Sequence, residues 1–251
     1  MIKIVTPWIF VFIIGGLPYT SPAVKKNKMT TAEFQFIHKA GNEDLNLETN
    51  YTNAWGEEFA ISRFKYYISN IEFITNEGKR IKADGENYFL ADEEDESSKK
   101  FAITIPAGTY TAVSFLIGVD SIRNVSGAQT GALDPLNGMF WTWKSGYIMA
   151  KMEGRSSASS LPGHLFEYHI GGFQGAENAV KKITLAFPGG EKIFSKNKKT
   201  VIELSVDVLA WFQHPEKITI GLYPSCTTPG PLAKKFADNY ADMFSISAIN
   251  E

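Results

Sequence analysis

The residues of this sequence that could carry chemistry are four histidines and one run of thioether and indole side chains. His38 and His169 end two segments with strand-like alternation, and glycine-containing backbone follows each of them. Met139, Trp141 and Trp143 alternate farther along the chain. Neutral imidazole is a good copper ligand, and a thioether suits Cu(I). The pattern is compatible with a copper site, provided that the two strand ends meet at one rim of the fold.

Each of these residues also has a purely structural interpretation. A single histidine at a strand end is more often hydrogen-bonded near the core than bound to a metal. The aromatic run could equally form a cross-strand ladder that packs the core. His164 lies five residues before His169, so strand alternation points it to the opposite face. His214 lies in a loop before Pro215, and both remain secondary candidates for a metal ligand.

Other kinds of site find little support in the sequence. A single cysteine, Cys226, can form neither a paired-cysteine metal motif nor an internal disulfide. The sequence contains no Gly-x-Ser-x-Gly elbow, no His-Glu-x-x-His motif and no phosphate-binding loop. The acidic run of residues 92–96 is typical of a solvated loop. We therefore expect a protein that is not an enzyme.

The charge of the chain argues against nucleic acid as a partner. The formal net charge is −2, and basic residues form no stripe along the sequence. Polar residues of the segment 120–138 could offer oxygen atoms to Ca²⁺, but turn capping explains them better.

Many short alternating segments separated by glycine and proline predict an all-β protein. The expected architecture is an antiparallel β-sandwich of the Ig-like or Greek-key type with a long Gly-rich loop at 120–138 and a short C-terminal helix at 232–244. A hairpin should join residues 139–143 to residues 147–152. The other expected strands cover residues 31–38, 59–73, 84–89, 101–105, 109–119, 165–170, 182–187, 200–208 and 217–222.

The N-terminus has the features of a signal peptide. Lys3 precedes an apolar run that is shorter than the ~20 residues needed to span a bilayer. Small residues at positions 21 and 23 predict cleavage after Ala23. Residues 24–30 then form a basic leader, and residues 31–251 form a single domain. We expect a periplasmic or secreted protein without stable membrane insertion after cleavage.

Several motifs resemble the MbnP-like family, a group of periplasmic copper-associated β-sandwich proteins. The resemblance covers nearly all of the chain that follows the signal peptide. The most specific motif is Asn-Gly-Met-Phe-Trp-Thr-Trp at residues 137–143. Further matches are Phe-Lys-Tyr-Tyr-Ile-Ser-Asn-Ile at 64–71, Ile-Gly-Val-Asp-Ser at 117–121, Gly-Ala-Leu-Asp-Pro at 131–135, Tyr-His-Ile-Gly-Gly at 168–172 and Ala-Asp-Asn-Tyr-Ala-Asp-Met-Phe at 237–244.

The resemblance implies copper handling or acquisition, with His38 and His169 at the family's histidine positions. It also implies a partner, a di-haem peroxidase related to MauG, which in some relatives oxidises a tryptophan to kynurenine near the copper. Trp141 or Trp143 would be the oxidised residue, with Met139 beside it. The alternative is a metal-free structural or ligand-binding module of the cell envelope.

Overall fold

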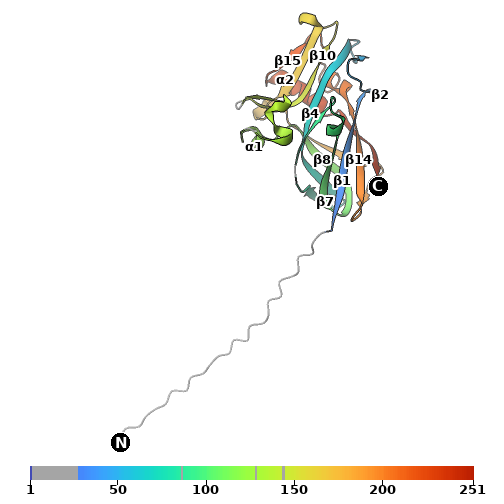
Figure 1. Cartoon of the computed structure of the whole chain (residues 1–251), viewed down its shortest axis with the longest axis vertical. Coiled ribbons are helices and arrows are strands. Elements are labelled where there is room, and N and C mark those ends of the chain that lie inside the picture. Colours follow the sequence, from blue (N-terminus) through green and yellow to red (C-terminus); the bar gives the residue numbers. More distant parts are fainter. Residues whose placement is uncertain (2–27, 86, 128, 143–144) are drawn as a thin grey trace.

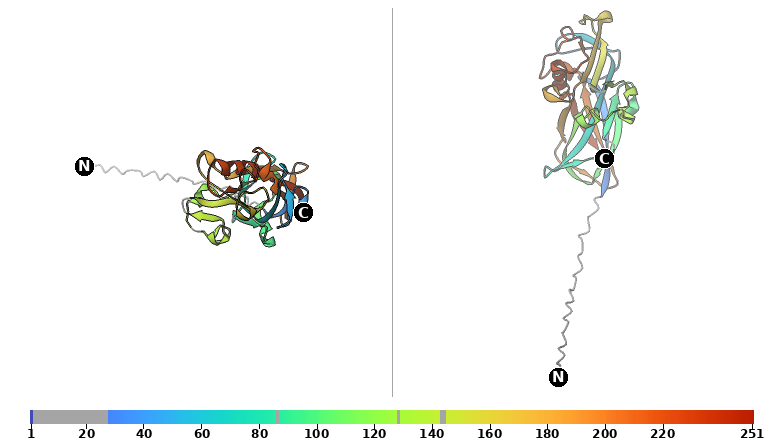
Figure 2. Two further views of the ribbon diagram at one scale, coloured as in Figure 1. Left: turned by 90° about the horizontal axis from the view of Figure 1, so that it is seen from above. Right: turned by 90° about the vertical axis from the view of Figure 1, so that its left-hand side faces the viewer.

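A computed structural model describes residues 1, 28–85, 87–127, 129–142 and 145–251. Apart from Met1, the predicted signal peptide and most of the predicted leader lie outside the described residues. The described chain is mainly β, and its long strands run roughly along the long axis of the domain (Figure 1). Figure 2 shows the same arrangement from two further directions. No helix in the described ranges is long and apolar enough to cross a membrane.

One layer of the fold is a sheet of five described strands. Its central strand β1 pairs in parallel with β14, with Phe34 opposite Ile202, while β2 and β7 pair antiparallel with the other edge of β1. The parallel pairing departs from the wholly antiparallel sandwich that the sequence predicts. The strands are β1 (Met29–Ala40), β2 (Glu43–Asp44), β7 (Lys100–Pro106), β14 (Lys199–Asp207) and β16 (Phe244–Asn250).

The second layer is a sheet of eleven described strands built around the 18-residue strand β4 (Glu58–Thr75). Its main path runs β12-β8-β4-β10-β11-β15, and the last pair is parallel. The strands are β3 (Asn50–Thr52), β5 (Arg80–Lys82), β6 (Tyr88–Asp92), β8 (Gly108–Ile117), β9 (Phe140–Thr142), β10 (Gly146–Arg155), β11 (Leu165–Gly171), β12 (Lys181–Ala186), β13 (Lys192–Phe194) and β15 (Ser225–Cys226).

The core between the two sheets is largely aromatic. Alternation along β1 turns Phe34 and Phe36 inward, where their rings lie 6.2 Å from Phe73 and 5.9 Å from Tyr66, respectively. Tyr66 also meets Phe244 of β16 at 5.4 Å. Successive strand residues point to opposite faces, so the inward position of Tyr66 turns its neighbours in β4 to the outer face of the larger sheet.

The long Gly-rich loop predicted at 120–138 covers that outer face. It contains helix α1 (Ser121–Asn124) and two short 3₁₀ turns, η2 (Gly131–Leu133) and η3 (Pro135–Asn137). Tyr67 of β4 and Tyr147 of β10 donate hydrogen bonds to its backbone, at Ala132 and Leu133. In Figure 1 it lies on the side of β4 away from β1 and β14. The predicted irregular loop is thus a cover fixed by tyrosine hydroxyls.

The C-terminal helix α2 (Pro231–Tyr240) lies beside β11 and the 3₁₀ turn η6 (Val208–Phe212). Phe236 and Tyr240 are buried on its apolar face, against Trp211 of η6. The 3₁₀ turn η1 (Glu96–Lys99) connects β6 to β7, and two further 3₁₀ turns, η4 (Pro162–His164) and η5 (Gly175–Glu177), lie before and after β11.

Most predicted elements are confirmed, and a few boundaries are wrong. The hairpin forms as β9 and β10. The predicted strand at 217–222 consists of turns and irregular backbone, and the last residue assigned to the helix, Phe244, begins β16. Strand β1 starts at Met29, inside the predicted leader, because its first residues pair with β7.

Candidate functional site

His38 lies between the two sheets and is almost completely buried. Its side chain is 1% exposed. Its Nδ1 lies 2.5 Å from Oε2 of Glu93, and its Nε2 lies 2.8 Å from the hydroxyl oxygen of Tyr66. The ring also packs edge-on against Phe64 at 5.1 Å. Both ring nitrogens are therefore engaged by protein side chains.

The charges of this cluster fix the direction of its hydrogen bonds. Burial lowers the pKa of His38, more than the hydrogen bond to Glu93 raises it. Burial alone would raise the pKa of Glu93, but His38 and Lys99 lower it overall. A neutral imidazole beside an ionised carboxylate must donate Nδ1–H to Glu93 and accept the Tyr66 hydroxyl proton at Nε2.

The acidic segment after β6 is only partly the solvated loop that its composition predicts. Glu93 points inward to His38 and accepts from Lys99 Nζ at 3.2 Å, while Lys99 also pairs with Glu96. Asp92 and Glu94, on either side of Glu93, point outward and pair with basic residues of β4. The alternation of β6 continues through these residues and produces this division. A pocket of about 350 Å³ opens beside His38, Glu93 and Lys99.

His169 belongs to a different cluster, on the outer face of the larger sheet. Its Nε2 lies 2.7 Å from Oε1 of Glu153 on the neighbouring strand β10. Arg63 donates to the second oxygen of Glu153 at 2.6 Å, and Lys151 donates to the carbonyl of Gly138 at 2.7 Å. The His169 hydrogen bond, with help from the two cations, lowers the pKa of Glu153 to about 2.

Trp141 lies on the same outer face as His169. A Cβ atom added to Gly171 would come within 2.5 Å of the indole atom Cζ3 of Trp141, so the ring lies directly on this backbone. Gly171 and His169 are two residues apart in β11 and share a face. Met139 is fully buried, and its carbonyl accepts from Ile148 N–H at 2.9 Å. The remaining predicted residue, Trp143, lies outside the described residues.

His38 and His169 do not converge, and the expectation that they meet at one rim is wrong. Tyr66, which contacts His38, pairs with Ala150 on the inner face of the sheet. The next residue, Lys151, pairs with His169 and faces the opposite way. The sheet itself therefore separates the two imidazoles, and their assignment as copper ligands stays a prediction.

The secondary candidates lie elsewhere on the surface. His164 is exposed, has φ +55°, and places Nδ1 3.1 Å from the carbonyl of Ser159. His214 is exposed, 3.4 Å from Asp242, and precedes the cis peptide bond of Pro215. Neither lies in the cluster around His38 or in the one around His169.

The described residues do not make a complete copper site as they stand. Across the described ranges, no group of three or more His, Cys, Asp or Glu side chains is placed to hold a metal ion. On the outer face, His169 offers one imidazole and Glu153 one carboxylate, but Lys151 and Arg63 lie beside them as cations. An unmodified indole adds no ligand atom. The residues present fit copper only in part.

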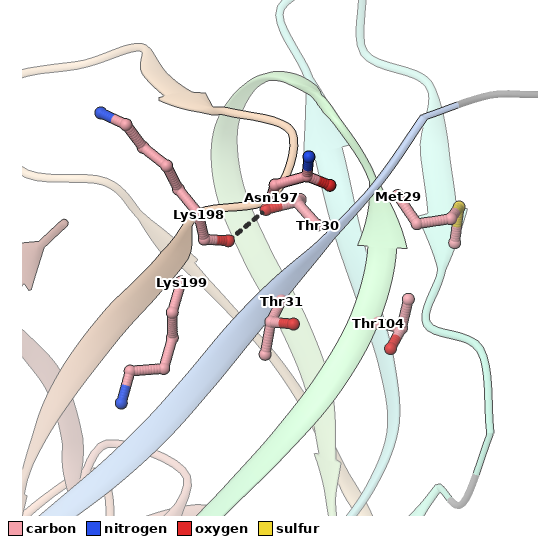
Figure 3. A pocket seen from close by; sticks show the side chains of 7 residues that line it. All are labelled: Met29, Thr30, Thr31, Thr104, Asn197, Lys198 and Lys199. Carbon is pink, nitrogen blue, oxygen red and sulfur yellow. Dashed lines mark hydrogen bonds between the residues drawn. The ribbon is translucent and has the colours of Figure 1, made fainter.

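A further pocket, of about 320 Å³, lies at the opposite end of β1 from His38 (Figure 3). Thr30 closes one side of it by donating to the carbonyl of Lys198 at 2.9 Å. Its other side chains are those of Met29, Thr31, Thr104, Asn197 and Lys199. This set contains no histidine or carboxylate and joins neither cluster.

Sequence reasoning identified His38, His169 and Trp141 but missed the side chains that hold them. Glu93 was hidden in an acidic run, although its parity with the apolar residue Ala91 in β6 marked it as inward-facing. Tyr66 lies in the strand predicted at 59–73 and in the motif at 64–71, but neither pattern marks its hydroxyl as a partner of His38. The pairing of Glu153 with His169 depends on the register between β10 and β11, which their separate sequences do not specify.

The fold and the two clusters define a mainly β sandwich that carries one histidine inside the core and a second beside an indole on its outer face. The sequence profile of the MbnP family matches residues 29–228, and the chain belongs to this family. MbnP from Methylosinus trichosporium is structurally similar, with a TM-score of 0.52 at 15% sequence identity, covering 88% of this chain and 100% of that one. At this identity the likeness shows the fold alone. Among curated proteins, none matches the sequence.

Proposed function

We propose that this protein binds copper outside the cytoplasm and serves copper handling or acquisition rather than catalytic turnover. Membership of the MbnP family supports a copper-related role. The observation that carries the finer proposal is the position of Trp141 against Gly171, on the same face of β11 as His169. An imidazole and an oxidisable ring are thereby held as neighbours on one rigid sheet.

In this proposal His169 supplies the imidazole. Glu153 holds Nε2 at 2.7 Å, which fixes the ring orientation and leaves Nδ1 for a metal. The buried imidazole of His38 is not part of the proposed site, because a metal at either of its nitrogens would displace Glu93 or Tyr66.

The missing ligands would come from oxidation of Trp141. Conversion of tryptophan to kynurenine adds two oxygen atoms and removes one carbon monoxide, and it exposes an aniline nitrogen and a ketone oxygen. These are the kinds of donor that the unmodified cluster lacks. A di-haem peroxidase related to MauG is the proposed partner for this step, and a signal peptide cleaved after Ala23 would bring the chain to the same compartment.

One observation favours the alternative, a metal-free module of the cell envelope. Both His38 and His169 already have side-chain partners, and the described residues hold no three-ligand cluster. Under this alternative the two clusters only stabilise the sandwich.

The two functions are separated by copper titration and intact mass of protein purified from its own host. We expect one copper per chain, a mass consistent with one kynurenine, and greatly weakened binding in His169→Ala and Trp141→Phe. His164→Ala, at an exposed position just before β11, is the matched control and should bind as the wild type does. Unchanged binding in both test variants would overturn the site, and absence of stoichiometric binding would favour the metal-free module.

A further inference from the structure

The buried tyrosines differ in what accepts their hydroxyl protons. Six of the seven in the described ranges donate to backbone carbonyls, which are too weakly basic to take up a proton. Tyr66 alone places its hydroxyl on a side-chain base, Nε2 of His38 at 2.8 Å. The six are Tyr51, Tyr67, Tyr110, Tyr147, Tyr168 and Tyr240.

The acceptor is prepared for a proton. His38 is buried and neutral, so Nε2 carries a lone pair, and Nδ1–H already donates to the ionised Glu93 at 2.5 Å. An imidazolium formed here would be stabilised at once by that carboxylate. Lys99 lies 3.2 Å from the same carboxylate, and Glu96 pairs with Lys99, so the cluster ends in a partly solvated ion pair.

The phenol, in contrast, cannot ionise by simple loss of its proton. Burial in the aromatic core, together with the charge of Glu93, raises the pKa of Tyr66 well above its ordinary value. Its ring is enclosed by Phe36, Phe64 and Phe244, at 5.9, 5.4 and 5.4 Å. A phenolate would face this apolar wall, and it is a far stronger base than the His38 imidazole, so the proton would return to it. Loss of the proton becomes favourable only if an electron leaves with it.

We propose that Tyr66 is a redox-active tyrosine with His38 as its built-in proton acceptor. A one-electron oxidant of high potential, such as a high-valent metal centre at the protein surface, takes one electron from the phenol. The phenolic O–H bond breaks, and its proton forms a bond to Nε2 of His38. The products are a neutral tyrosyl radical, an imidazolium paired with Glu93 and the reduced oxidant, and re-reduction of the radical returns the proton.

The site lies close enough to the surface for such an exchange. The imidazole separates Tyr66 from the pocket beside Glu93, and the ring centroids of His38 and Tyr66 are 5.5 Å apart. A second aromatic route leads from Tyr66 through Phe64 to the indole of Trp211, with a centroid distance of 6.1 Å for the last step. The proton need not leave the cluster, because its donor and acceptor are already in contact.

The test is laser flash-quench oxidation of copper-free protein, with a ruthenium tris-diimine photo-oxidant and a cobalt(III) amine quencher, followed by electron paramagnetic resonance. We expect a neutral tyrosyl signal that changes when ring-deuterated tyrosine is incorporated. Tyr66→Phe, which removes one hydroxyl, should abolish it. Tyr168→Phe, at an equally buried phenol that donates to the carbonyl of Tyr223, should retain it.

His38→Gln should also remove most of the signal, since an amide is no proton acceptor. In the wild type, formation of the radical should be slower in deuterated buffer, because the proton moves with the electron. A signal that survives Tyr66→Phe unchanged would overturn the proposal, even if His38→Gln failed to fold. Since the experiment contains no copper, its outcome is independent of the proposed copper site.

Discussion

His38 and Glu93 are joined by a hydrogen bond of 2.5 Å between Nδ1 and Oε2, across 55 residues of sequence. The contact connects β1 of the smaller sheet to the residue that directly follows β6 of the larger one. It also buries a carboxylate whose other close partner is Lys99. The hydrogen bond is therefore a polar contact between the apolar inner faces of the two sheets, and its removal should destabilise the protein.

Replacing His38 by alanine should lower the free energy of unfolding by about 3–5 kcal/mol, because Glu93 and the Tyr66 hydroxyl would both lose their partner inside the sandwich. His169→Ala should cost only about 1 kcal/mol, since Arg63 and Lys151 still surround Glu153. Urea unfolding of the two variants under identical conditions checks the difference. Equal losses of unfolding free energy in the two variants would show that the buried His38–Glu93 contact contributes no more than the outer His169–Glu153 contact.

Protonation of the Glu153 carboxylate should lower the free energy of unfolding at acidic pH. The pKa of this carboxyl is lowered from 4.5 to about 2, so its contribution is full above pH 4.5 and disappears as the pH falls through 2. The shift corresponds to about 3 kcal/mol. Unfolding of the wild type and Glu153→Gln should therefore differ at pH 6 and converge near pH 2. Glu167→Gln, which lies opposite Glu153 in the β-ladder, is the control and should unfold like the wild type at both pH values.

Gly171→Ala tests the packing of Trp141. The added methyl group would meet Cζ3 of the indole at 2.5 Å and the carbonyl oxygen of Tyr147 at 2.9 Å. We expect a loss of about 1–3 kcal/mol and a displaced indole, measured as a red shift in tryptophan fluorescence. Gly108→Ala is the control, because its nearest neighbour, Tyr110, lies at an ordinary 3.8 Å. An unchanged spectrum in Gly171→Ala would mean that the indole does not rest there.

Asn124→Ala should loosen the cover of the outer face. The buried amide accepts from Tyr147 N–H at 2.8 Å and donates to the carbonyls of Val119 and Asp120 at 2.6 and 2.9 Å. Without it we expect faster protease cleavage between residues 120 and 138. Ile122→Ala, at an exposed position of the same helix, should be cut at the wild-type rate. Equal rates in both variants would contradict an anchoring role.

Sequence patterns predicted the strands well because most of them are amphipathic and end at glycine or proline. They failed at residues 217–222, where Ile218 and Ile220 are buried, as in a strand, but the backbone turns. Local alternation records which side chains are buried and says nothing about ladder pairing. The predicted C-terminal end of the helix was wrong for a similar reason. Phe244 fits the helical spacing, but it begins β16 and pairs with β14.

The sequence singles out His38, His169 and Trp141 as candidates, but it predicts neither their polar partners nor their assembly. Strand alternation does not decide the direction of His164, because this residue lies in the 3₁₀ turn η4 (Pro162–His164) just before β11. No local signal specifies the layer to which each strand belongs. Because His38 comes from the inner face of one sheet and His169 from the outer face of the other, two correct strand assignments led to a wrong convergence. Such relations depend on topology, which emerges only from the whole chain.

The parallel pairing of β1 with β14 has a consequence for how the protein reaches its native state. The first strand has its longest partner in residues 199–207, so that ladder cannot form before most of the chain exists. Contacts of such sequence separation are associated with slow folding. During synthesis, this edge of β1 should therefore remain unpaired until residues 199–207 have been made, which leaves it accessible to a chaperone.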